Sequence, residues 1–137
     1  MSIWKNTEIK YEKPWGFETR WGSPFGMGGK LIHIHKGHRT SLKYYKMKNQ
    51  LLYCLHGNVK IHAPDEREFG IRCCEGKGNY FSLEPGDYIL IQSENPYRVE
   101  ALVDAVMVEV VSGMDGPVTV LADDYGRKVN VNLDCNN

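Results

Sequence analysis

Three of the five histidines in the sequence lie close together, at His33, His35 and His38. Two imidazoles at positions i and i+2 of a strand point to the same side of a sheet, where they could share a metal ion. Ile32 and Ile34 have the opposite parity and are predicted to face a core. The histidines would then face outward, so the cluster is either a metal site or a solvent-facing pair, and the second interpretation is favoured.

Polar side chains of a different kind fill the run from Ser41 to Gln50, which combines lysines, tyrosines and amides and contains no acidic residue. Ammonium groups beside phenols, as at Lys43 and Tyr45, could bind a phosphate or a carboxylate. Lysines along a strand edge also discourage aggregation between sheets. Composition alone favours this second, structural interpretation of the run.

The sequence lacks the motifs of several other chemistries. It has no GxSxG nucleophile turn, no P-loop and no GxGxxG segment that leads from a strand into a helix. Its four cysteines are not spaced as the CxxC pairs of a zinc site or as a disulfide framework. We therefore expect ordinary reduced thiols at Cys54, Cys73, Cys74 and Cys135.

The elements that would position these side chains are short and rich in β-branched and aromatic residues. Glycine and proline separate them at short intervals, and no segment between the turns has a convincing helical pattern. About nine strands at this spacing predict an all-β sandwich or barrel. The predicted strands cover residues 30–35, 40–45, 51–55, 59–62, 80–83, 88–92, 97–102, 106–111 and 118–121.

Two of the predicted strands have informative faces. In residues 106–111 one face is entirely valine and the other holds Met107, Glu109 and Val111, which is typical of a strand with one wholly buried face. In residues 51–55 both faces are apolar, which suits a strand that is covered on both sides. A second copy of the chain in a homodimer could provide the second cover.

Length and composition place these strands in one domain. The chain has 137 residues, of which 42% are hydrophobic, so it can bury a single core without disulfides or a structural metal. Its 17 basic and 17 acidic side chains cancel, which leaves no net field to attract nucleic acid or an anionic membrane. No apolar stretch approaches the ~20 residues of a membrane span, and the polar start from Met1 to Lys13 does not resemble a signal peptide. We expect a cytoplasmic protein.

Four segments, taken together, resemble the cupin superfamily and, more narrowly, the type II mannose-6-phosphate isomerase family, which includes the cupin domain of mannose-1-phosphate guanylyltransferases. Glu12–Glu18 is similar to the opening KPWG signature of that family, and Gly37–Lys43 is similar to its first strand motif. Gly86–Glu100 resembles the second cupin motif, and Ala122–Arg127 resembles the closing segment. The four segments follow the family order and span almost the whole chain.

The resemblance implies a single cupin-type jelly-roll β-barrel over residues 1–137. Core strands would occupy residues 30–121, and an N-terminal arm (1–29) and a C-terminal segment (122–137) would pack on the barrel. The stretch 64–78 would be an extended surface hairpin or loop without assigned chemistry. The binding site of such a barrel lies at its wide mouth.

Members of this family hold a divalent metal ion with a Gln, a His and a Glu from the first motif and a His from the second. The corresponding positions in this sequence are Lys43, Tyr45, Gln50 and Tyr97. An ammonium, two phenols and an amide do not replace imidazole and carboxylate ligands at neutral pH. We therefore expect no metal cofactor at the usual positions, and the histidine cluster described above is the alternative metal site.

The family's reaction moves a proton between C1 and C2 of a sugar phosphate through an enediol, with the metal acting as a Lewis acid. Without the metal, Lys43 could supply the positive charge while Tyr45 and Tyr97 donate hydrogen bonds. The resemblance also implies that Arg127 binds phosphate through its planar guanidinium. The alternative for Arg127 is an ion pair with one of the aspartates of the Asp-Asp-Tyr-Gly-Arg segment.

Three functions remain open. The first is a mannose-6-phosphate isomerase-like cupin of sugar-phosphate or polysaccharide metabolism, for which metal-dependent activity is not expected. The second is a non-catalytic module that binds a sugar or a small anion through Lys43, Tyr45, Gln50 and Tyr97. The third is a structural cupin that acts as a homodimer.

Overall fold

The structure, a computed structural model, describes residues 3–22, 24–64, 79–114 and 116–130. All nine predicted strands are present, and a short 3-10 turn spans Pro24–Gly26. Two further strands precede them. The strands are Ile9–Lys13 (β1), Gly16–Arg20 (β2), Met27–Ile34 (β3), Leu42–Tyr45 (β4), Lys48–His56 (β5), Val59–Ala63 (β6), Asn79–Leu83 (β7), Tyr88–Ile91 (β8), Arg98–Ala101 (β9), Ala105–Gly113 (β10) and Val118–Ala122 (β11).

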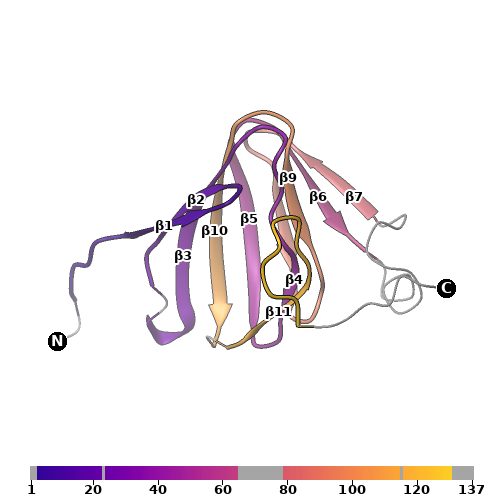
Figure 1. Cartoon of the computed structure of the whole chain (residues 1–137). Coiled ribbons are helices and arrows are strands. Elements are labelled where there is room, and N and C mark those ends of the chain that lie inside the picture. Colours follow the sequence, from indigo (N-terminus) through magenta and orange to yellow (C-terminus); the bar gives the residue numbers. More distant parts are fainter. Residues whose placement is uncertain (1–2, 23, 65–78, 115, 131–137) are drawn as a thin grey trace.

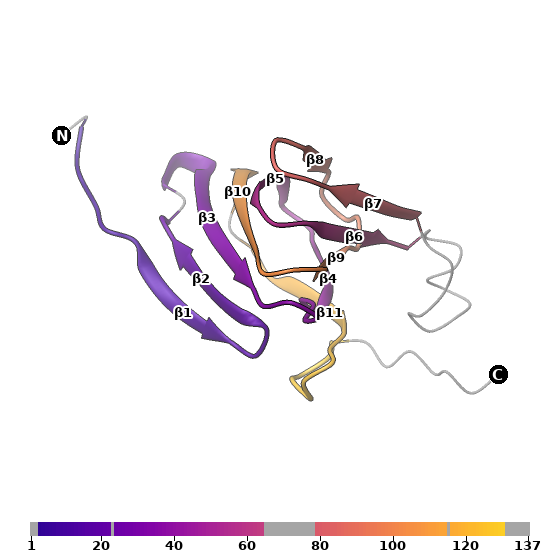
Figure 2. The ribbon, with the colours of Figure 1, turned by 90° about the horizontal axis from the view of Figure 1, so that it is seen from above.

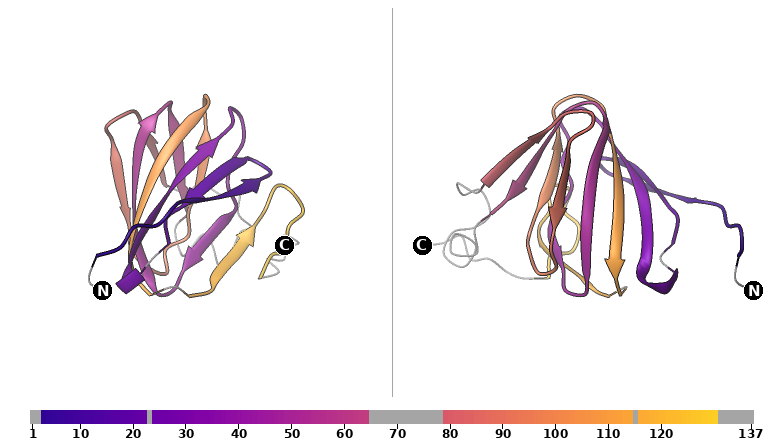
Figure 3. Two further views of the ribbon diagram at one scale, coloured as in Figure 1. Left: turned by 90° about the vertical axis from the view of Figure 1, so that its left-hand side faces the viewer. Right: turned by 180° about the vertical axis from the view of Figure 1, so that it is seen from behind.

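The strands form one large and two small antiparallel sheets. The large sheet has the order β1-β2-β3-β10-β5-β8, and the small ones are β11-β4 and β7-β6-β9. Figure 1 and Figure 3 show strands that converge at one end of the molecule and spread at the other. Seen from above in Figure 2, the small sheets lie opposite the strands β3, β10, β5 and β8. The fold is thus the predicted all-β sandwich, with a narrow and a wide end.

The hairpin β1-β2 was not predicted from the sequence. β2 pairs with β3 from Gly16 opposite Ile34 to Arg20 opposite Lys30, and β1 pairs with β2, so the hairpin widens the large sheet. The side chains of β1 are almost all exposed. Its charged sequence therefore lacks the apolar alternation that marks the other strands.

The buried face of β10 is the mixed face and not the valine face. Met107 is fully buried and Glu109 is 2% exposed, whereas Val110 is 48% exposed. One face of the strand is buried, as predicted, but its composition is reversed from what hydrophobicity alone favours. The reason is that the Glu109 carboxylate contacts Lys30 and Gln50 inside the barrel.

The strand β5 is covered on one side only within a single copy of the chain. Leu52 and Cys54 are fully buried in the core between the sheets. Leu51 and Tyr53, which alternate with them, are only partly buried. We predicted that both faces of β5 would be covered. Within one copy of the chain, the face that carries Leu51 and Tyr53 is covered only in part.

The remaining expectations concern membranes and thiols. No helix among the described residues is long and apolar enough to cross a membrane. Cys54 is a buried free thiol, as expected, while Cys73, Cys74 and Cys135 lie outside the described residues. Apart from Pro64, the predicted hairpin or loop at 64–78 also lies outside them.

Two turn glycines allow a matched test of this packing. Gly57 (φ +86°) and Gly86 (φ +98°) both have left-handed backbones, which costs a residue with a Cβ atom about 1–2 kcal/mol. A Cβ atom on Gly57 would lie 2.5 Å from the Asp104 carbonyl oxygen, whereas one on Gly86 would meet nothing within 4 Å. We expect Gly57→Ala to lower the free energy of unfolding by at least about twice as much as Gly86→Ala, measured by urea denaturation. Equal losses would contradict the close approach at Gly57.

Candidate functional site

Lys43 and Tyr97 form the centre of the site. Lys43 lies in β4, Tyr97 lies directly before β9, and the two residues exchange backbone hydrogen bonds of 3.1 and 3.0 Å. Residues that pair directly in an antiparallel bridge project their side chains to the same side of the sheet. Tyr97 is 3% exposed and belongs to the core, so the side chain of Lys43 also points into the barrel. Tyr45, two residues further along β4, shares that face.

Gln50 of β5 connects Tyr97 to the opposite sheet. Its amide group donates hydrogen bonds to the Tyr97 hydroxyl at 2.6 Å and to a carboxylate oxygen of Glu109 at 2.5 Å. Because the Tyr97 oxygen accepts this bond, its own hydroxyl hydrogen is available to a ligand. The neutral amide of Gln50 also avoids the repulsion that a second carboxylate would create beside Glu109.

The carboxylates of Glu18 and Glu109 both face the ammonium group of Lys30. The Nζ atom of Lys30 lies 2.9 Å from Glu18 and 3.7 Å from Glu109, and Arg20 donates a further hydrogen bond of 2.7 Å to Glu18. Burial acts to raise the pKa of the Glu18 carboxyl, but Lys30 and Arg20 outweigh it and hold that pKa at about 2. Burial acts to lower the pKa of Lys30, but the two carboxylates outweigh it, so that pKa is raised.

Lys43 differs from Lys30 because no carboxylate pairs with it. Among the described residues, its ammonium group makes no hydrogen bond or ion pair. Burial and the charge of Lys30 lower its pKa from 10.5 to about 7, although Glu109 and Glu18 act in the opposite direction. Near neutral pH, Lys43 is therefore a partly protonated amine whose charge a bound anion would stabilise.

The two phenols of the site are neutral at physiological pH. Burial raises the pKa of Tyr45 to about 12, and burial together with Glu109 raises the pKa of Tyr97 well above its ordinary value. A neutral phenol can donate a hydrogen bond to an anion. Lys48 lies over the Tyr45 ring, with its Nζ atom 4.0 Å from the ring centroid, and this brings another cation close to the phenol.

Two cavities adjoin this cluster. The larger, of about 710 Å³, is mostly apolar, and Gln50 and Tyr97 contribute polar groups to its wall. The smaller, of about 500 Å³, has a charged and aromatic lining with three cations and one carboxylate, a balance that suits an anion. The charged and aromatic residues of the smaller cavity are Tyr11, Arg20, Trp21, Lys30, Tyr45, Lys48 and Glu109.

The four residues that the sequence resemblance assigns to metal-ligand positions do not fit a metal ion. The amide of Gln50 directs its hydrogens, and not a lone pair, toward Tyr97 and Glu109, and Lys43 places an amine in the same interior. The nearby carboxylates already contact Lys30. Within the described ranges, no group of three or more His, Cys, Asp or Glu side chains is placed to hold a metal.

The histidine cluster lies away from this interior. His33 faces outward from β3 and stacks on Phe17 with ring centroids 4.1 Å apart, while the alternating isoleucines are buried as predicted. His35 and His38 lie beyond the end of β3, and their rings meet edge to face at 6.1 Å. The structure therefore favours the outward-facing interpretation of this cluster.

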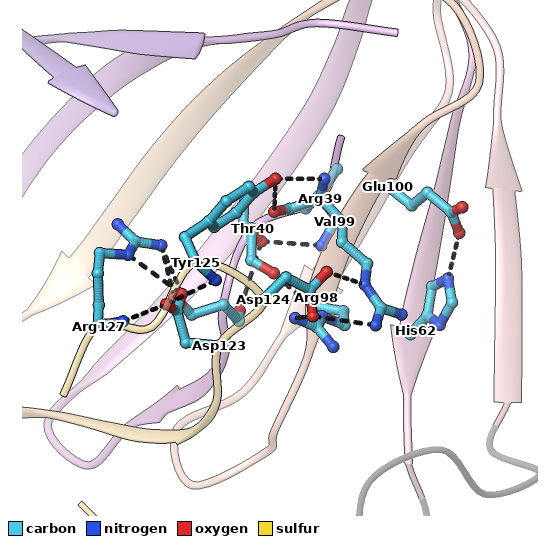
Figure 4. A network of polar contacts seen from close by, with 11 residues as sticks. Arg39, Thr40, His62, Arg98, Val99, Glu100, Asp123, Asp124, Tyr125 and Arg127 are labelled. Carbon is cyan, nitrogen blue, oxygen red and sulfur yellow. Dashed lines mark hydrogen bonds and ion pairs between the residues drawn. The ribbon is translucent and has the colours of Figure 1, made fainter. Parts of the chain in front are cut away.

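Arg127 belongs to a separate network that fastens the C-terminal segment beside β4 (Figure 4). Its guanidinium donates hydrogen bonds to Asp123 at 2.8 and 3.1 Å and to the Ser41 hydroxyl at 2.9 Å. The Asp123 carboxylate has no exposed surface and also accepts hydrogen bonds from the backbone of Tyr125 and Arg127. The expected alternative, an ion pair with an aspartate, is thus observed, and phosphate binding by Arg127 stays a prediction.

The neighbouring Asp124 extends this network to two more arginines. Arg39 donates to both of its carboxylate oxygens, and Arg98 donates to it at 3.2 Å (Figure 4). Arg98 is 3% exposed and also donates to the carbonyl oxygen of Thr40 at 3.0 Å. These contacts hold the segment before β4 in place and so help to position Lys43.

The sequence did not predict the ion-paired cluster of the site, which consists of Glu18, Lys30 and Glu109. These residues come from β2, β3 and β10, and the pairing register places Glu109 directly opposite Lys30. The available signal was Glu109 itself, a carboxylate in an otherwise aliphatic strand. Its partners could not be found without the register.

The fold is similar to those of several solved structures. The capsular polysaccharide assembling protein CapF from Staphylococcus aureus matches with a TM-score of 0.69 and 12% identity over 87% of this chain and 35% of CapF. KdgF from Halomonas sp. matches with a TM-score of 0.63 and 13% identity over 81% of this chain and 96% of KdgF. A variant of oxalate decarboxylase from Bacillus subtilis matches with a TM-score of 0.64 and 14% identity over 82% of this chain and 31% of the decarboxylase. The chain has the cupin fold.

The cupin fold confirms the predicted all-β jelly roll. At these identities the likeness shows the fold alone, and it does not distinguish the mannose-6-phosphate isomerase family from other cupins. The chain spans about a third of the length of CapF. Comparison with protein-family models and with the sequences of curated proteins found no match.

The Arg127 network predicts a stability defect with a defined pH dependence. Burial acts to raise the pKa of Asp123, but hydrogen bonds from Arg127, Ser41 and Tyr125 outweigh it and lower that pKa from 3.8 to about 2. A lowered carboxyl pKa stabilises the fold above the unfolded value, and this stability is lost as the pH falls through the folded value. Arg127→Met should therefore lower the free energy of unfolding by about 1–3 kcal/mol at pH 7, because it leaves the buried carboxylate underpaired.

The measurement is chemical denaturation of the wild type, Arg127→Met and a control, Lys128→Met, which removes an adjacent exposed cation. We expect the deficit of Arg127→Met to shrink as the pH is lowered from 3.8 toward about 2, and Lys128→Met to resemble the wild type. A deficit that stays constant over that pH range would contradict the role given to Asp123.

Proposed function

We propose that this cupin binds a small anionic carbohydrate, with a sugar phosphate as the first candidate, at the wide mouth of its barrel, and that Lys43 provides the positive charge there without a metal ion. The observation that carries the proposal is the contrast between two interior lysines. Lys30 is fully engaged by Glu18 and Glu109, whereas Lys43 has no partner among the described residues. Burying a charged amine without a counter-charge costs free energy, and a bound anion would offset that cost. Anion binding is therefore the role that we assign to Lys43.

The surroundings of Lys43 supply further recognition groups. The hydroxyl of Tyr97 can donate a hydrogen bond, since its oxygen accepts one from Gln50. The charged cavity, which Tyr45 lines from the same face of β4 that carries Lys43, adds Lys48 and the aromatic rings of Tyr11 and Trp21. Aromatic rings beside cations suit a ligand that has both an apolar ring face and an anionic group, as a sugar phosphate has.

The cupin neighbours support this ligand class without establishing it. CapF is named as a capsular polysaccharide assembling protein, and oxalate decarboxylase and oxalate oxidase are named for a small dianion. Polysaccharide-related chemistry and small anions therefore both occur on this fold. The transfer of either property to this chain is our inference.

A more specific possibility is the aldose–ketose isomerisation that the sequence resemblance implies. The proton moves between C1 and C2, and negative charge develops on the enediolate oxygen. Lys43 and the hydroxyl of Tyr97 would stabilise that charge, and Glu109, whose carboxylate lines the charged cavity, would act as the base. A mannose-6-phosphate isomerase-like activity would then proceed without Lewis-acid assistance.

Two further functions are distinguished by simple observations. A non-catalytic module would bind mannose 6-phosphate without exchanging its C2 proton with deuterated solvent. A purely structural cupin would bind no sugar phosphate at all, so its melting temperature would not change, because a ligand that binds only the native state must stabilise it.

The first test measures binding of mannose 6-phosphate by calorimetry at about pH 6.5, where Lys43 is largely protonated. We expect Lys43→Met to weaken binding roughly ten- to hundredfold, the range for loss of one charge-assisted hydrogen bond. Lys36→Met removes an exposed lysine as the matched control and should leave binding unchanged. Equal affinities of wild type and Lys43→Met would overturn the proposal.

The second test uses the pH dependence of stability. Because burial lowers the folded-state pKa of Lys43 to about 7, the unfolded chain binds more protons between about pH 7 and 10.5, and stability rises with pH across that window. Lys43→Met should therefore be more stable than the wild type, most strongly below pH 7, and the gap should close toward pH 10.5. Melting temperatures across this range measure the gap, and a gap that does not change with pH would contradict the burial of an unpaired amine.

The third test is elemental analysis of the untagged protein, purified without chelator and then incubated with manganese, zinc, nickel or iron. We expect far less than one retained metal ion per chain, because the donor set does not fit one. Retention of about one ion per chain, abolished by Gln50→Ala, would revive metal-assisted isomerisation at this site.

A further inference from the structure

The amine of Lys43 differs from that of Lys30 in its chemical state. Lys30 is held by two carboxylates, whereas Lys43 pairs with no group in the part of the chain that the structure describes. An amine that keeps its proton cannot attack a carbonyl carbon, because its lone pair is occupied. Burial and the charge of Lys30 lower the pKa of Lys43 to about 7, so about half of its amine is unprotonated at neutral pH. Lys43 is therefore a nucleophile as well as a cation.

Neutral phenols and an amide share the interior with this amine. The backbone bridge between Lys43 and Tyr97 directs both side chains to the same side, and Tyr45 shares that face of β4. Gln50 donates to the Tyr97 oxygen at 2.6 Å, which leaves the hydroxyl hydrogen of Tyr97 for another acceptor. The site thus combines an unpaired amine with a hydrogen-bond donor that suits a carbonyl oxygen.

A ligand can approach the amine from the neighbouring cavities. Lys43 keeps part of its surface accessible. Tyr45 lines the charged cavity and Tyr97 lines the larger, apolar one. Arg20 and Lys48 also line the charged cavity, where they would hold the phosphate of a sugar phosphate. The carbonyl end of the same ligand would then lie toward Lys43.

We propose that Lys43 forms an imine with the carbonyl carbon of the open-chain form of the bound sugar phosphate. The imine rests on the proposed function, because the site must first bind the sugar phosphate, and it adds a covalent step to that function. It also narrows the ligand class to sugars with a free carbonyl group. Phosphorylated aldoses and ketoses meet this requirement, whereas glycosides do not.

Imine formation is balanced without an oxidant or a reductant. The Nζ lone pair of Lys43 forms a bond to the carbonyl carbon, and the π electrons of the C–O double bond move to the oxygen. A proton passes from the nitrogen to this oxygen and gives a carbinolamine. The oxygen then accepts a hydrogen bond from Tyr97 and a proton from solvent and leaves as water, while the nitrogen lone pair forms the C–N double bond. Amine, aldehyde and one proton thus give a protonated imine and one water molecule, and hydrolysis reverses the step.

A protonated imine keeps a positive charge at the Lys43 nitrogen. In the adduct of an aldose, this charge withdraws electrons from the C2–H bond, as a Lewis-acid metal on the carbonyl oxygen does. The imine therefore gives a chemical reason for a lysine at a position where the sequence resemblance implies a metal ligand.

The test traps the imine with sodium cyanoborohydride, which reduces a protonated imine to a stable secondary amine. The full chain is incubated at neutral pH with mannose 6-phosphate and the reductant, and peptide mass spectrometry locates the adduct. Each trapped adduct adds the mass of the sugar phosphate less one oxygen atom. We expect Lys43 to be modified at least about tenfold faster than the exposed Lys46, because about half of the Lys43 amine is unprotonated.

Two variants and one ligand control accompany the trapping experiment. Lys43→Arg replaces the amine with a guanidinium, which forms no imine under these conditions, and should abolish the rapid modification. Lys46→Met removes an exposed lysine just beyond β4 and should leave the rapid modification unchanged. Mannitol 1-phosphate has the phosphate and the hydroxyls but no carbonyl group, so an excess of it should suppress the modification of Lys43 by competition.

The outcomes separate the imine from the function on which it depends. Rapid modification of Lys43 that mannitol 1-phosphate suppresses would support the imine. If calorimetry shows that the wild type binds both phosphates but Lys43 is modified no faster than Lys46, the imine is overturned and the proposed function stands. Rapid modification that mannitol 1-phosphate does not suppress would also overturn the imine, because the adduct would then form without a sugar-phosphate site. If neither phosphate binds and Lys43 is not modified, both proposals are overturned.

Discussion

The arrangement of the whole barrel depends on the ion pairs that Lys30 makes with Glu18 and Glu109. A carboxylate moved into a protein interior costs several kcal/mol unless a cation and hydrogen-bond donors compensate it. Lys30 provides the cation for both carboxylates, Arg20 adds a donor for Glu18, and Gln50 adds one for Glu109. Removal of Lys30 alone would take away the cation that both buried carboxylates share.

This polar interior determines which side of β10 faces solvent. Side chains alternate along a strand, so the inward direction of Glu109 forces the three valines of the strand outward. The exposed apolar face is therefore a consequence of the charged site and not a separate feature. A chain that kept the valines inside would have a more ordinary core, but it would lose both the acidic residue in the interior and the apolar surface outside.

Much of the fold could be predicted from the sequence, because β-branched runs between glycines and prolines are local signals. All nine strands of the barrel were found in this way, as was the inward direction of Ile32 and Ile34. The hairpin β1-β2 was missed because its charged residues gain their order by pairing with β3. The site was found only in part, since the meeting of Lys30 with Glu109 is set by strand register, which no local pattern encodes.

The two polar networks use the same residue types, and the difference between them lies in how completely their charges are paired. The carboxylates of Asp123 and Asp124 each accept several hydrogen bonds from arginines, a hydroxyl or the backbone. Such complete pairing is expected of a network whose role is to hold the chain in place. Inside the barrel Lys30 is paired in the same way, but Lys43 is not. A structural network gains no stability from an unpaired buried amine, whereas a binding site needs a group whose charge is paired only when the ligand is present. For this reason Lys43, and not the more highly connected Arg127, is the residue on which ligand binding should depend.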